Sequence, residues 1–339
     1  MSTIRSVAVA EPSGKLQVVE SEAVAPAHGQ VRIAVEACGV CHTDSHFVDN
    51  HLPGLAFPVT PGHEIAGRIA EVGPGVQRWA VGDRVAVGWF GGHCTYCDPC
   101  RRGDFVHCER AQVPGLAYPG GYAESVTVPA NALARIPDEL TAVEAAPLAC
   151  AGVTTFAALR RSQARPGDLV AVLGLGGLGH LGVQFAASMG FDTAVIARGE
   201  EKASLARELG ARHYIDSTRQ DVAAELTALG GASAVLATAA NADAMAVAVD
   251  GLKANGELLV VGIDAAPMRL SPLQLITNSR TVHGHPSGDA MDVEDTLAFA
   301  AQQGVRAWVE EAPLAEAAAA YDRMMRNEAR FRMVLTTGA

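Results

Sequence analysis

The sequence predicts an α/β protein in two parts, a β-rich N-terminal part followed by a doubly wound parallel sheet. Residues 1 to about 150 are rich in Gly, Pro and Val and contain short apolar runs separated by turns. From about residue 152, short runs typical of buried strands alternate with helical stretches. Alternating strands and helices are typical of a parallel sheet that is covered on both faces.

In the first part, three runs predict short strands: QVRIAVEAC at 30–38, GRIAEVG at 67–73 and DRVAVGW at 83–89. Gly and Pro predict turns at 73–75 and 81–83, because these residues supply the backbone angles that turns require. The short strands and frequent turns indicate a separate β-rich domain.

In the second part, the strand and helix signals follow one another in the order expected of βαβ units. The predicted strands are 168–174, 193–198, 234–240 and 257–262, and the predicted helices are 180–190, 200–210 and 241–253. After about residue 288 the sequence predicts two more helices, at 291–304 and 313–327, and a closing strand at 331–337.

The composition excludes some function classes. The 339-residue chain has a net charge of −11 and a pI of about 5.4, which argues against non-specific binding to nucleic acid because that requires a basic face. We find no apolar run of about 18 residues free of charged and turn residues and no signal-peptide core, so we expect neither a membrane span nor export. The sequence therefore predicts a soluble, cytoplasmic protein.

Four cysteines lie close together: Cys94, Cys97, Cys100 and Cys108. Four thiolates are the usual ligands of a structural zinc ion, and gaps of two residues allow neighbouring sulfur atoms to converge on one ion. The alternative is a pair of disulfides, which is less common in a cytosolic chain. The cluster predicts a structural zinc site but fixes no function, because zinc ribbons occur in many proteins.

A glycine-rich turn follows the first strand of the second part. It contains Gly174, Gly176, Gly177, Leu178 and Gly179 and runs into a helix. With a strand before it, a helix after it and another strand about twenty residues on, the GxGxxG pattern predicts a dinucleotide-binding turn of the Rossmann type. The alternative is a glycine-rich turn that binds no ligand.

The end of the next strand bears on the choice of dinucleotide. An NAD site normally has an acid there for the ribose 2′-hydroxyl, but Ala197 occupies this position. The neighbouring Arg198 could bind a 2′-phosphate through two hydrogen bonds, which favours NADP over NAD. In the alternative, Arg198 is a solvated surface charge, and Glu200 or Glu201 binds the ribose.

Three cysteines lie outside the cluster. Cys41 opens the segment CHTDSH, and Cys150 lies between the two parts of the chain. Together with His63 they are three soft or borderline ligands from distant segments, a set that suits a catalytic zinc ion with one open position. Taken singly, each has an ordinary explanation, since a lone cysteine is usually a small buried apolar residue; we expect this of Cys38.

These motifs, in this order, resemble those of the zinc-dependent alcohol dehydrogenases of the medium-chain dehydrogenase/reductase superfamily. The resemblance rests on CGVCHTDSH, TPGHEIAGRIAEVG, the four-cysteine segment, GGYAES, PLACAGVTT and GLGGLG, and it covers essentially the whole chain. It implies that Cys41, His63 and Cys150 bind a catalytic zinc ion. Glu64 lies beside it and could coordinate transiently, and Asp44 matches the carboxylate that orients His63.

The resemblance also implies further site residues. Thr43 matches the hydroxyl that contacts the alkoxide oxygen, and His46 matches the residue that passes the proton through the cofactor ribose to solvent. His42 and Arg332 match positions that touch the pyrophosphate, and Lys202 matches a lysine near the adenosine ribose. The departure at Ala197 puts the choice between NADP(H) and NAD(H) in doubt.

The family fold implies a GroES-like catalytic domain at 1–151 with a structural zinc lobe at about 91–110. It implies a Rossmann cofactor domain at 152–288 and a return to the catalytic domain at 289–339. The chain lacks the extra loop of longer dimeric relatives, which predicts a homotetramer of the microbial type, with two zinc ions per chain.

The resemblance implies reversible hydride transfer between NAD(P)(H) and a small alcohol or aldehyde. Trp89 and Leu52 match positions that line the alcohol pocket, and they predict primary alcohols of medium or aromatic size; as an alternative, both are ordinary packing residues. Two other readings of the chain are a zinc-free quinone reductase and a non-catalytic zinc-ribbon protein. The intact glycine turn and the set Cys41, His63 and Cys150 argue against them.

Overall fold

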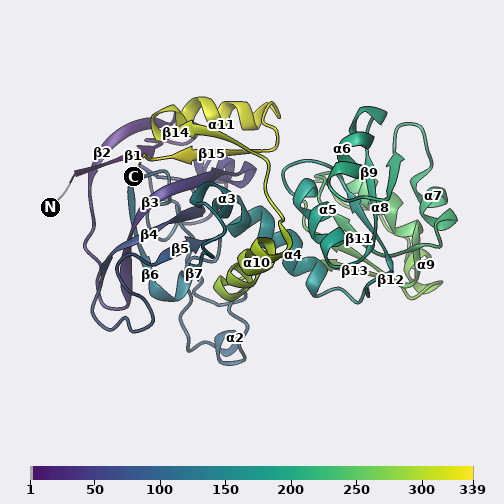
Figure 1. The fold of residues 1–339 in the computed structure, drawn as a ribbon, viewed down its shortest axis with the longest axis horizontal. Helices are drawn as coiled ribbons and strands as arrows, with labels where there is room; N and C mark the ends of the chain where they lie inside the picture. The colour runs from purple at the N-terminus through teal and green to yellow at the C-terminus, as the bar shows by residue number, and fades with distance from the viewer. Residues whose placement is uncertain (1–2, 339) are drawn as a thin grey trace. The chain divides into compact units, whose positions relative to one another are not determined.

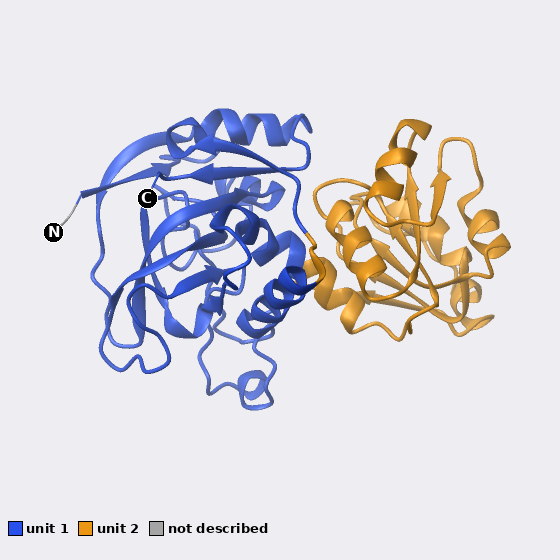
Figure 2. Ribbon diagram, viewed as in Figure 1, with its two compact units in different colours: residues 1–153, 288–302, 306–339 blue, residues 154–287, 303–305 orange. Residues whose placement is uncertain are grey.

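The structure is a computed structural model that describes residues 3–338. The chain forms two compact units (Figure 2). Unit 1 takes in the chain up to residue 153, the segment 288–302 and the chain from residue 306 onward. Unit 2 consists of residues 154–287 and the short segment 303–305. Each unit is described by itself.

Unit 1 is built mainly on antiparallel strands (Figure 1), with β14 and β15 paired in parallel. Its strands are β1 (Thr3–Ala8), β2 (Gln17–Glu22), β3 (Gln30–Val40), β4 (Glu64–Val72), β5 (Arg84–Val87), β6 (Ser125–Pro129), β7 (Ala134–Arg135), β14 (Val309–Pro313) and β15 (Arg332–Thr336). Its helical segments are η1 (His42–Asp44), α1 (Ser45–Val48), α2 (Asp98–Arg101), η2 (Ala130–Ala132), α3 (Ala142–Pro147), η3 (Leu148–Gly152), α10 (Ala290–Gln303), η5 (Leu314–Glu316) and α11 (Ala317–Met325).

The main sheet of unit 1 has the order β14-β15-β3-β4-β5-β7, with β6 paired to β3, while β1 and β2 form a separate antiparallel pair. Along β3, alternate residues such as Val31, Ile33 and Val35 are fully buried, and the residues between them are half-buried. This is the alternation that a strand with one face on a core requires. The centre of the sheet therefore packs into the core of unit 1.

Unit 2 contains a six-stranded, all-parallel sheet with helices around it (Figure 1). Its strands are β8 (Leu169–Leu173), β9 (Asp192–Ala197), β10 (His213–Asp216), β11 (Ala232–Ala237), β12 (Leu252–Val260) and β13 (Thr281–Gly284). Its helical segments are α4 (Val153–Arg160), α5 (Gly179–Ser188), η4 (Glu200–Lys202), α6 (Ala203–Glu208), α7 (Val222–Ala228), α8 (Ala242–Asp250) and α9 (Pro272–Ile276).

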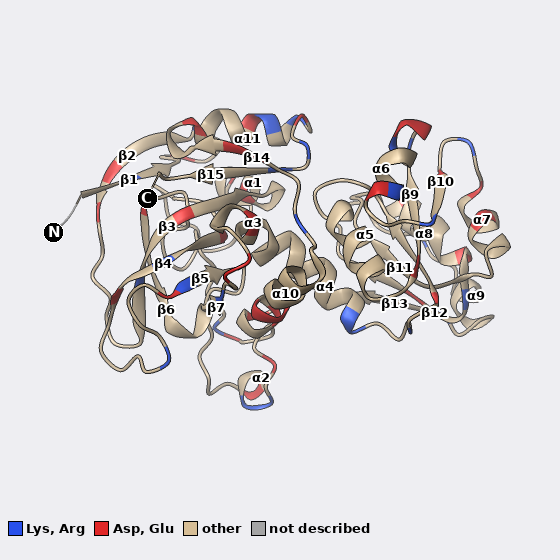
Figure 3. Cartoon of the chain, in the orientation of Figure 1, with Lys and Arg blue, Asp and Glu red and all other residues tan. Residues whose placement is uncertain are grey.

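The strand order of unit 2 is β10-β9-β8-β11-β12-β13. In order along the chain this is 3-2-1-4-5-6, the order of the Rossmann fold, in which ligands bind at the carboxyl ends of the strands where the order reverses. Here the order reverses between β8 and β11. These two strands are fully buried and carry no charged residue, as Figure 3 shows for the centre of this sheet.

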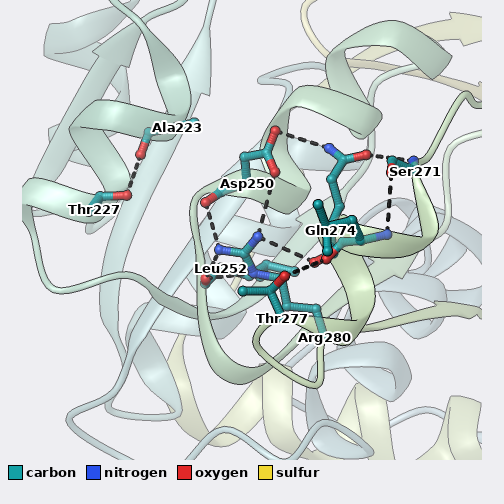
Figure 4. Close-up of polar contacts among 9 residues, drawn as sticks. Ala223, Thr227, Asp250, Leu252, Ser271, Gln274, Thr277 and Arg280 are labelled. Atoms are coloured by element: carbon teal, nitrogen blue, oxygen red, sulfur yellow. Dashed lines mark hydrogen bonds and ion pairs between the residues drawn. The ribbon is translucent and has the colours of Figure 1, made fainter.

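The last strand of this sheet, β13, is joined to its neighbours by Arg280, as Figure 4 shows. The Arg280 guanidinium donates hydrogen bonds to the backbone oxygens of Leu252 (2.7 Å) and Asp250 (2.9 Å), at the junction of α8 and β12. Gln274 of α9 donates to the Asp250 carboxylate (3.0 Å) and accepts from the backbone N–H of Ser271 (2.7 Å). One arginine thus ties α8, α9, β12 and β13 together.

One helical stretch crosses the boundary between the units. Residues Ala142–Arg160 have the length and mean hydropathy (1.5) of a membrane-crossing helix, whereas the sequence analysis expects no such run. In the structure 78% of this window is buried, as in the core helix of a folded protein. Pro147 lies inside it, and the five-residue π-helical turn η3 follows immediately. Such turns are rare and occur mostly at functional sites.

The structure also differs from the sequence prediction in its elements. The four strands predicted for unit 2 correspond to β8, β9, β11 and β12, but β10 and β13 have few apolar residues, and the sequence pattern alone did not predict them. The helix predicted from residue 313 begins at Ala317, because residues up to Pro313 pair with β15 as strand β14.

Candidate functional site

Four side chains of unit 1 meet in a buried cluster. The ligand atoms of Cys41, His63, Glu64 and Cys150 all lie within 4.8 Å of one another. Cys41 directly follows β3, His63 directly precedes β4, Glu64 is the first residue of β4, and Cys150 lies on the π-helical turn η3. The structure thus brings together the three predicted zinc ligands and the neighbouring glutamate.

The pairing of β3 with β4 explains how distant residues meet. These strands are antiparallel, and Gly39 lies opposite Glu64 at the end of the pair. Cys41 lies two residues after Gly39, and His63 lies one residue before Glu64. The pairing of Gly39 with Glu64 therefore places Cys41 and His63 close together. Gly39 is required here, because a Cβ at this position would collide with the Glu64 carboxylate.

The orientation of His63 is fixed by a buried carboxylate. Asp44 is fully buried, and its Oδ1 lies 3.0 Å from Nδ1 of His63. Its Oδ2 accepts hydrogen bonds from the backbone N–H of Cys41 (2.9 Å) and from the Tyr122 hydroxyl (2.9 Å). With both carboxylate oxygens acting as acceptors, Asp44 holds the proton of His63 on Nδ1 and leaves Nε2 as a lone-pair donor.

These residues fit a metal ion. Nε2 of His63 is buried and has no hydrogen-bond partner among the described residues, and the same is true of Oε2 of Glu64. A buried nitrogen lone pair is costly to leave without a partner. Two thiols, an imidazole nitrogen and a carboxylate are ligand types that zinc accepts. Cys41, His63 and Cys150 would hold the ion, with Glu64 beside it.

The ionisable groups of the cluster shift one another's pKa values in different directions. The pKa of the Cys41 thiol lies well below its usual value, mainly because the Cys150 thiol donates a hydrogen bond to it and despite its burial. For His63, burial alone would lower the pKa, but the Asp44 carboxylate outweighs burial and raises it. The same Cys41–Cys150 hydrogen bond raises the pKa of Cys150. Of the two thiols, Cys41 is therefore the one whose surroundings favour the thiolate.

Glu64 is paired with Arg332 inside the unit. The Arg332 guanidinium, only 5% exposed, donates to Oε1 of Glu64. Burial raises the pKa of Glu64 to about 7, although the charge of Arg332 acts to lower it. The family resemblance predicts that Arg332 touches the pyrophosphate. In the structure its buried contact is with Glu64, and its Nε has no partner among the described residues.

The four-cysteine segment forms a second cluster. The sulfur atoms of Cys94, Cys97, Cys100 and Cys108 lie within 4.8 Å of one another. All four are free thiols, so the alternative of two disulfides is wrong. Sγ of Cys97 lies 3.9 Å from Sγ of Cys108, close to the edge of about 3.8 Å of a zinc–sulfur tetrahedron with 2.3 Å bonds.

Backbone N–H groups point at these sulfur atoms. The N–H of Cys94 and that of Arg110 each donate to Sγ of Cys108 (3.3 Å), and the N–H of Cys97 donates to Sγ of Cys94 (3.4 Å). Burial raises the pKa of Cys94, but hydrogen bonds from the N–H groups of Tyr96 and Cys97 outweigh it and lower the pKa to about 6. The segment is therefore set up to carry thiolates.

Aromatic side chains surround His63. The Trp89 ring meets the His63 ring edge-on at a centroid distance of 5.1 Å, and the Phe47 ring lies 6.3 Å from His63. Leu52 is half-buried and packs against the same core. Trp89 is thus beside the cluster, whereas Leu52 packs against the core of unit 1.

The other predicted residues of this segment are carried by two short helices. Thr43 lies on η1 and is half-buried, and His42, on the same turn, is exposed. His46 lies on α1 and is half-buried.

The glycine turn lies at the carboxyl end of β8. Gly174 has a φ of +103°, which residues with a Cβ rarely adopt, and its N–H donates to the backbone oxygen of Ile196 (2.8 Å). A Cβ at Gly179 would collide with the backbone oxygen of Gly174, so the helix α5 can begin this close to the strand only with glycine. Gly176, by contrast, has open space around it, as a backbone that a ligand approaches requires.

The end of β9 carries the residues predicted to choose the dinucleotide. Ala197 is the last residue of the strand and is buried, while Arg198 after it is exposed and Lys202 is half-buried on η4. The buried acid at the end of the neighbouring strand β10, Asp216, is already engaged. Its Oδ1 accepts from the N–H of Gly199 (2.9 Å) and from the N–H and hydroxyl of Thr218.

Comparison with known proteins identifies the family. Residues 27–138 match the model of the alcohol dehydrogenase GroES-like domain, and residues 177–302 match that of the zinc-binding dehydrogenases. Alcohol dehydrogenase patD of Penicillium expansum is 40% identical over 335 residues, covering 99% of this chain and 98% of the relative. The chain belongs to the zinc-dependent alcohol dehydrogenase family. Its GroES-like and Rossmann-like parts are those of this family.

Solved structures of the family have the same fold. A cinnamyl alcohol dehydrogenase of Sorghum bicolor is 31% identical, with a TM-score of 0.89 over 99% of this chain and 98% of that one. The protein CAD of Helicobacter pylori, solved in complex with NADP(H), is 27% identical, with a TM-score of 0.86 over 98% of each chain.

Sequence reasoning missed two partners within the site. Tyr122 lies in the segment GGYAES, but nothing in the local sequence shows that its hydroxyl reaches Asp44, 78 residues away. The pairing of Glu64 with Arg332 joins residues 268 positions apart. The signal that could have pointed to both is the presence of an ionisable or hydroxyl-bearing side chain in an otherwise apolar strand or loop.

Proposed function

We propose that the protein is an alcohol dehydrogenase and aldehyde reductase that uses a zinc ion held by Cys41, His63 and Cys150, and NADP(H) in preference to NAD(H). The observation that carries this proposal is the buried His63 imidazole, whose Nδ1 is fixed by Asp44 and whose Nε2 has no partner. A histidine that is held in this way beside two thiols has the arrangement of a metal ligand.

When bound, zinc supplies a Lewis acid at the substrate oxygen, and the nicotinamide supplies or accepts the hydride. The chain's own residues do the rest. Asp44 keeps His63 in the tautomer that ligates through Nε2. The Thr43 hydroxyl would take up the substrate proton as it releases its own, and His46 would pass a proton on, because an imidazole exchanges protons near neutral pH. The Trp89 ring covers one side of His63 and excludes water there.

We propose that unit 2 binds the dinucleotide and unit 1 carries the chemistry. In unit 2 the glycine turn, Gly174 to Gly179, lies at the point where the strand order reverses. The N-terminus of α5 directly follows this turn, and the positive end of a helix dipole is suited to phosphate. The domains would then run 1–151 and 289–339 for catalysis, with the zinc lobe at about 91–110, and 152–288 for the cofactor.

The preference for NADP(H) rests on Ala197 and Arg198. No carboxylate stands at the end of β9, and Asp216 on the neighbouring strand is occupied by donors of its own chain. The exposed Arg198 guanidinium is available for a 2′-phosphate. Ala197→Asp combined with Arg198→Ile should reverse the ratio of kcat/KM for NADPH and NADH. A wild-type enzyme that uses NADH at least as well as NADPH would refute this preference.

We propose that Trp89 and Leu52 set the substrate size, with primary alcohols and aldehydes of medium or aromatic size preferred. The contact of Trp89 with His63 supports this, because a pocket wall has to lie beside the metal ligands. Trp89→Ala should shift kcat/KM toward branched and larger substrates, by an amount equal to about 1–3 kcal/mol per methylene group accommodated. An unchanged substrate profile in a folded variant would place Trp89 outside the pocket.

We also propose that the protein works as a homotetramer. The strand β13 ends the sheet of unit 2, and its outer edge has no partner strand among the described residues. Large apolar side chains are highly exposed nearby in the chain, namely Ile263 (69%), Leu273 (69%) and Ile276 (74%). Light scattering coupled to size-exclusion chromatography tests this, and a monomer at micromolar concentration would exclude it.

The function itself is tested by three measurements on the purified protein. Elemental analysis should find two zinc ions per chain. Titration with NADPH should change the cofactor fluorescence, and a panel of aldehydes should support oxidation of NADPH. A protein that binds zinc but no dinucleotide would not be a dehydrogenase. A protein that reduces quinones rather than aldehydes would be a quinone reductase, and the proposed function would be wrong.

A further inference from the structure

Two histidines lie in contact beside the metal-binding segment of unit 1. Nδ1 of His46 lies 3.4 Å from Nδ1 of His51, and the two rings are 5.7 Å apart at an angle of 58°. The backbone supports this contact, because the N–H of His51 donates to the backbone oxygen of His46 (2.9 Å). The pair is thus built by the end of helix α1.

The two rings differ in their exposure. His46 is half-buried, whereas His51 is exposed. A neutral imidazole carries one proton, on either nitrogen, so two facing Nδ1 atoms can share one hydrogen bond with one ring as donor and the other as acceptor. The pair therefore connects a half-buried imidazole to one that is in contact with water.

We propose that His51 extends the proton pathway of this enzyme, so that the substrate proton reaches water through a His46–His51 pair. This inference rests on the proposed function, in which His46 receives that proton. His51 touches neither substrate nor cofactor and acts through His46, so it is a positioning and transfer residue rather than a catalytic one.

The proton balance is simple and involves no electrons. A proton arrives at Nε2 of His46, and the proton on Nδ1 of His46 moves to Nδ1 of His51. The proton on Nε2 of His51 then leaves to water. Both rings end neutral with their proton on the other nitrogen, and exchange with water or the reverse transfer during aldehyde reduction restores the starting tautomers.

Two other titratable groups, Asp49 and Tyr321, belong to this region. Asp49, on the turn between the two histidines, accepts a hydrogen bond from the Ser13 hydroxyl (3.0 Å). Tyr321 of α11 has a pKa of about 12, raised by burial and then by the charges of Asp49 and Asp44, so it stays protonated through the working range of a histidine. Asp49 is thus engaged by Ser13 and Tyr321 keeps its proton, so the histidine pair is the better candidate for carrying the proton.

The test compares His51→Gln with wild type and with His28→Gln, a control at another exposed histidine of unit 1. Glutamine keeps the size and polarity of the side chain but cannot carry a proton. We expect kcat for alcohol oxidation to fall about tenfold in His51→Gln, less than the 10²–10⁴-fold that a general base contributes. KM, zinc content and Tm should stay as in wild type, and His28→Gln should keep full activity.

Two further readouts separate proton transfer from a structural effect. The hindered base 2,6-dimethylpyridine, which takes up protons but coordinates metals poorly, should restore kcat in His51→Gln and leave wild type unchanged. In histidine NMR of the zinc-loaded protein, His46 should titrate together with His51 in wild type and as a single group in His51→Gln.

The outcomes are distinct. Unchanged kcat in His51→Gln, a loss that the base does not restore, or independent titration of the two rings would each overturn the histidine pathway while leaving the dehydrogenase function in place. Wild-type protein that turns over no alcohol would overturn the proposed function and the pathway together.

Discussion

The two candidate metal sites of unit 1 are built in opposite ways. The ligands of the lobe, Cys94 to Cys108, come from one short segment, whereas those of the other cluster, Cys41 to Cys150, come from three places in the fold. The sulfur atoms of the lobe are contacted mainly by backbone N–H groups and by one another. The other cluster is surrounded by side chains that fix it, such as Asp44, Tyr122 and Arg332.

This difference indicates what each cluster needs from its metal. The apolar core of the lobe consists of the cysteines themselves and half-buried Phe105, and its only regular element is the four-residue helix α2. Without the metal such a segment has little to hold it in place. The ligands of the other cluster are attached to β3, β4 and the helical stretch with Cys150, which belong to a large core. That scaffold should persist without metal, so we expect a metal there to serve chemistry rather than folding.

The largest expected effect is on turnover, from Cys41→Ser. Removing one ligand of the buried cluster should remove the Lewis acid, which is worth several kcal/mol of the barrier, so kcat/KM should fall by about 10³-fold or more. Circular dichroism and Tm should stay close to wild type, because the scaffold of the cluster does not depend on the ion.

The matched control is Cys38→Ala, at a buried cysteine of the same strand that is not among the ligands. It should keep its zinc content and most of its activity. Full activity in Cys41→Ser, or a single zinc ion in wild-type protein, would refute the assignment of this cluster.

The next effect is on stability, from Cys97→Ser in the lobe. The variant should lose one zinc ion per chain, and its free energy of unfolding should fall by several kcal/mol, because a structural zinc ion contributes directly to folding. The molecules that remain folded should keep kcat near the wild-type value.

Limited proteolysis should locate the change, with new cleavage sites within residues 91–110 only. If Cys97→Ser loses activity without losing stability, the lobe would serve chemistry as the buried cluster does, and the proposed difference between the two clusters would be wrong.

The contrast between the clusters also explains what the sequence could predict. The lobe ligands were identified from spacing, because two-residue gaps place sulfur atoms together whatever the rest of the fold does. Cys41, His63 and Cys150 have no such spacing, and they could be grouped only through the resemblance to a family. The groups that support them, such as Tyr122, are joined to them by contacts over 78 or more residues, which no local pattern reports.

The same holds for the fold of unit 2. Strands β8 and β11 were predicted well because buried parallel strands are continuous apolar runs. The edge strands β10 (HYID) and β13 (TVHG) mix polar and apolar residues, since one side of each faces outward. Their pairing depends on the neighbouring strands β9 and β12 rather than on their own sequence.

A third prediction concerns the hydrogen bond that fixes His63. In Asp44→Asn one carboxylate oxygen becomes an NH₂ group. If NH₂ faces His63 it forces the proton onto Nε2, the ligating nitrogen, and if it faces the other way it meets the N–H of Cys41. Either arrangement should lower zinc affinity and kcat/KM by about 10–100-fold.

A competitive zinc chelator measures the affinity. Asp49→Asn, on the same segment but paired with Ser13, is the control and should change neither quantity. Equal losses in both variants would indicate a general effect of charge rather than the orientation of His63.

The smallest effect should come from Tyr122→Phe. The Tyr122 hydroxyl is fully buried, and its hydrogen bond to Asp44 is one of two that Oδ2 accepts. Its loss leaves Asp44 still bound by the N–H of Cys41 and by His63, so the carboxylate should stay in place. We expect the free energy of unfolding to fall by about 1–1.5 kcal/mol, as for one buried hydrogen bond, and kcat/KM to fall only a few-fold.

Tyr118→Phe provides the matched control, because its hydroxyl also donates to a single acceptor, the backbone oxygen of Gly91 (2.6 Å), but away from Asp44. The two variants should lose similar amounts of stability, measured by urea unfolding. Only Tyr122→Phe should also weaken zinc binding at the buried cluster, because only there does the lost hydrogen bond belong to the group that orients a ligand. If both variants retained the same zinc affinity, the Tyr122 hydroxyl would serve packing alone, and the orientation of His63 would depend on Asp44 and Cys41 without it.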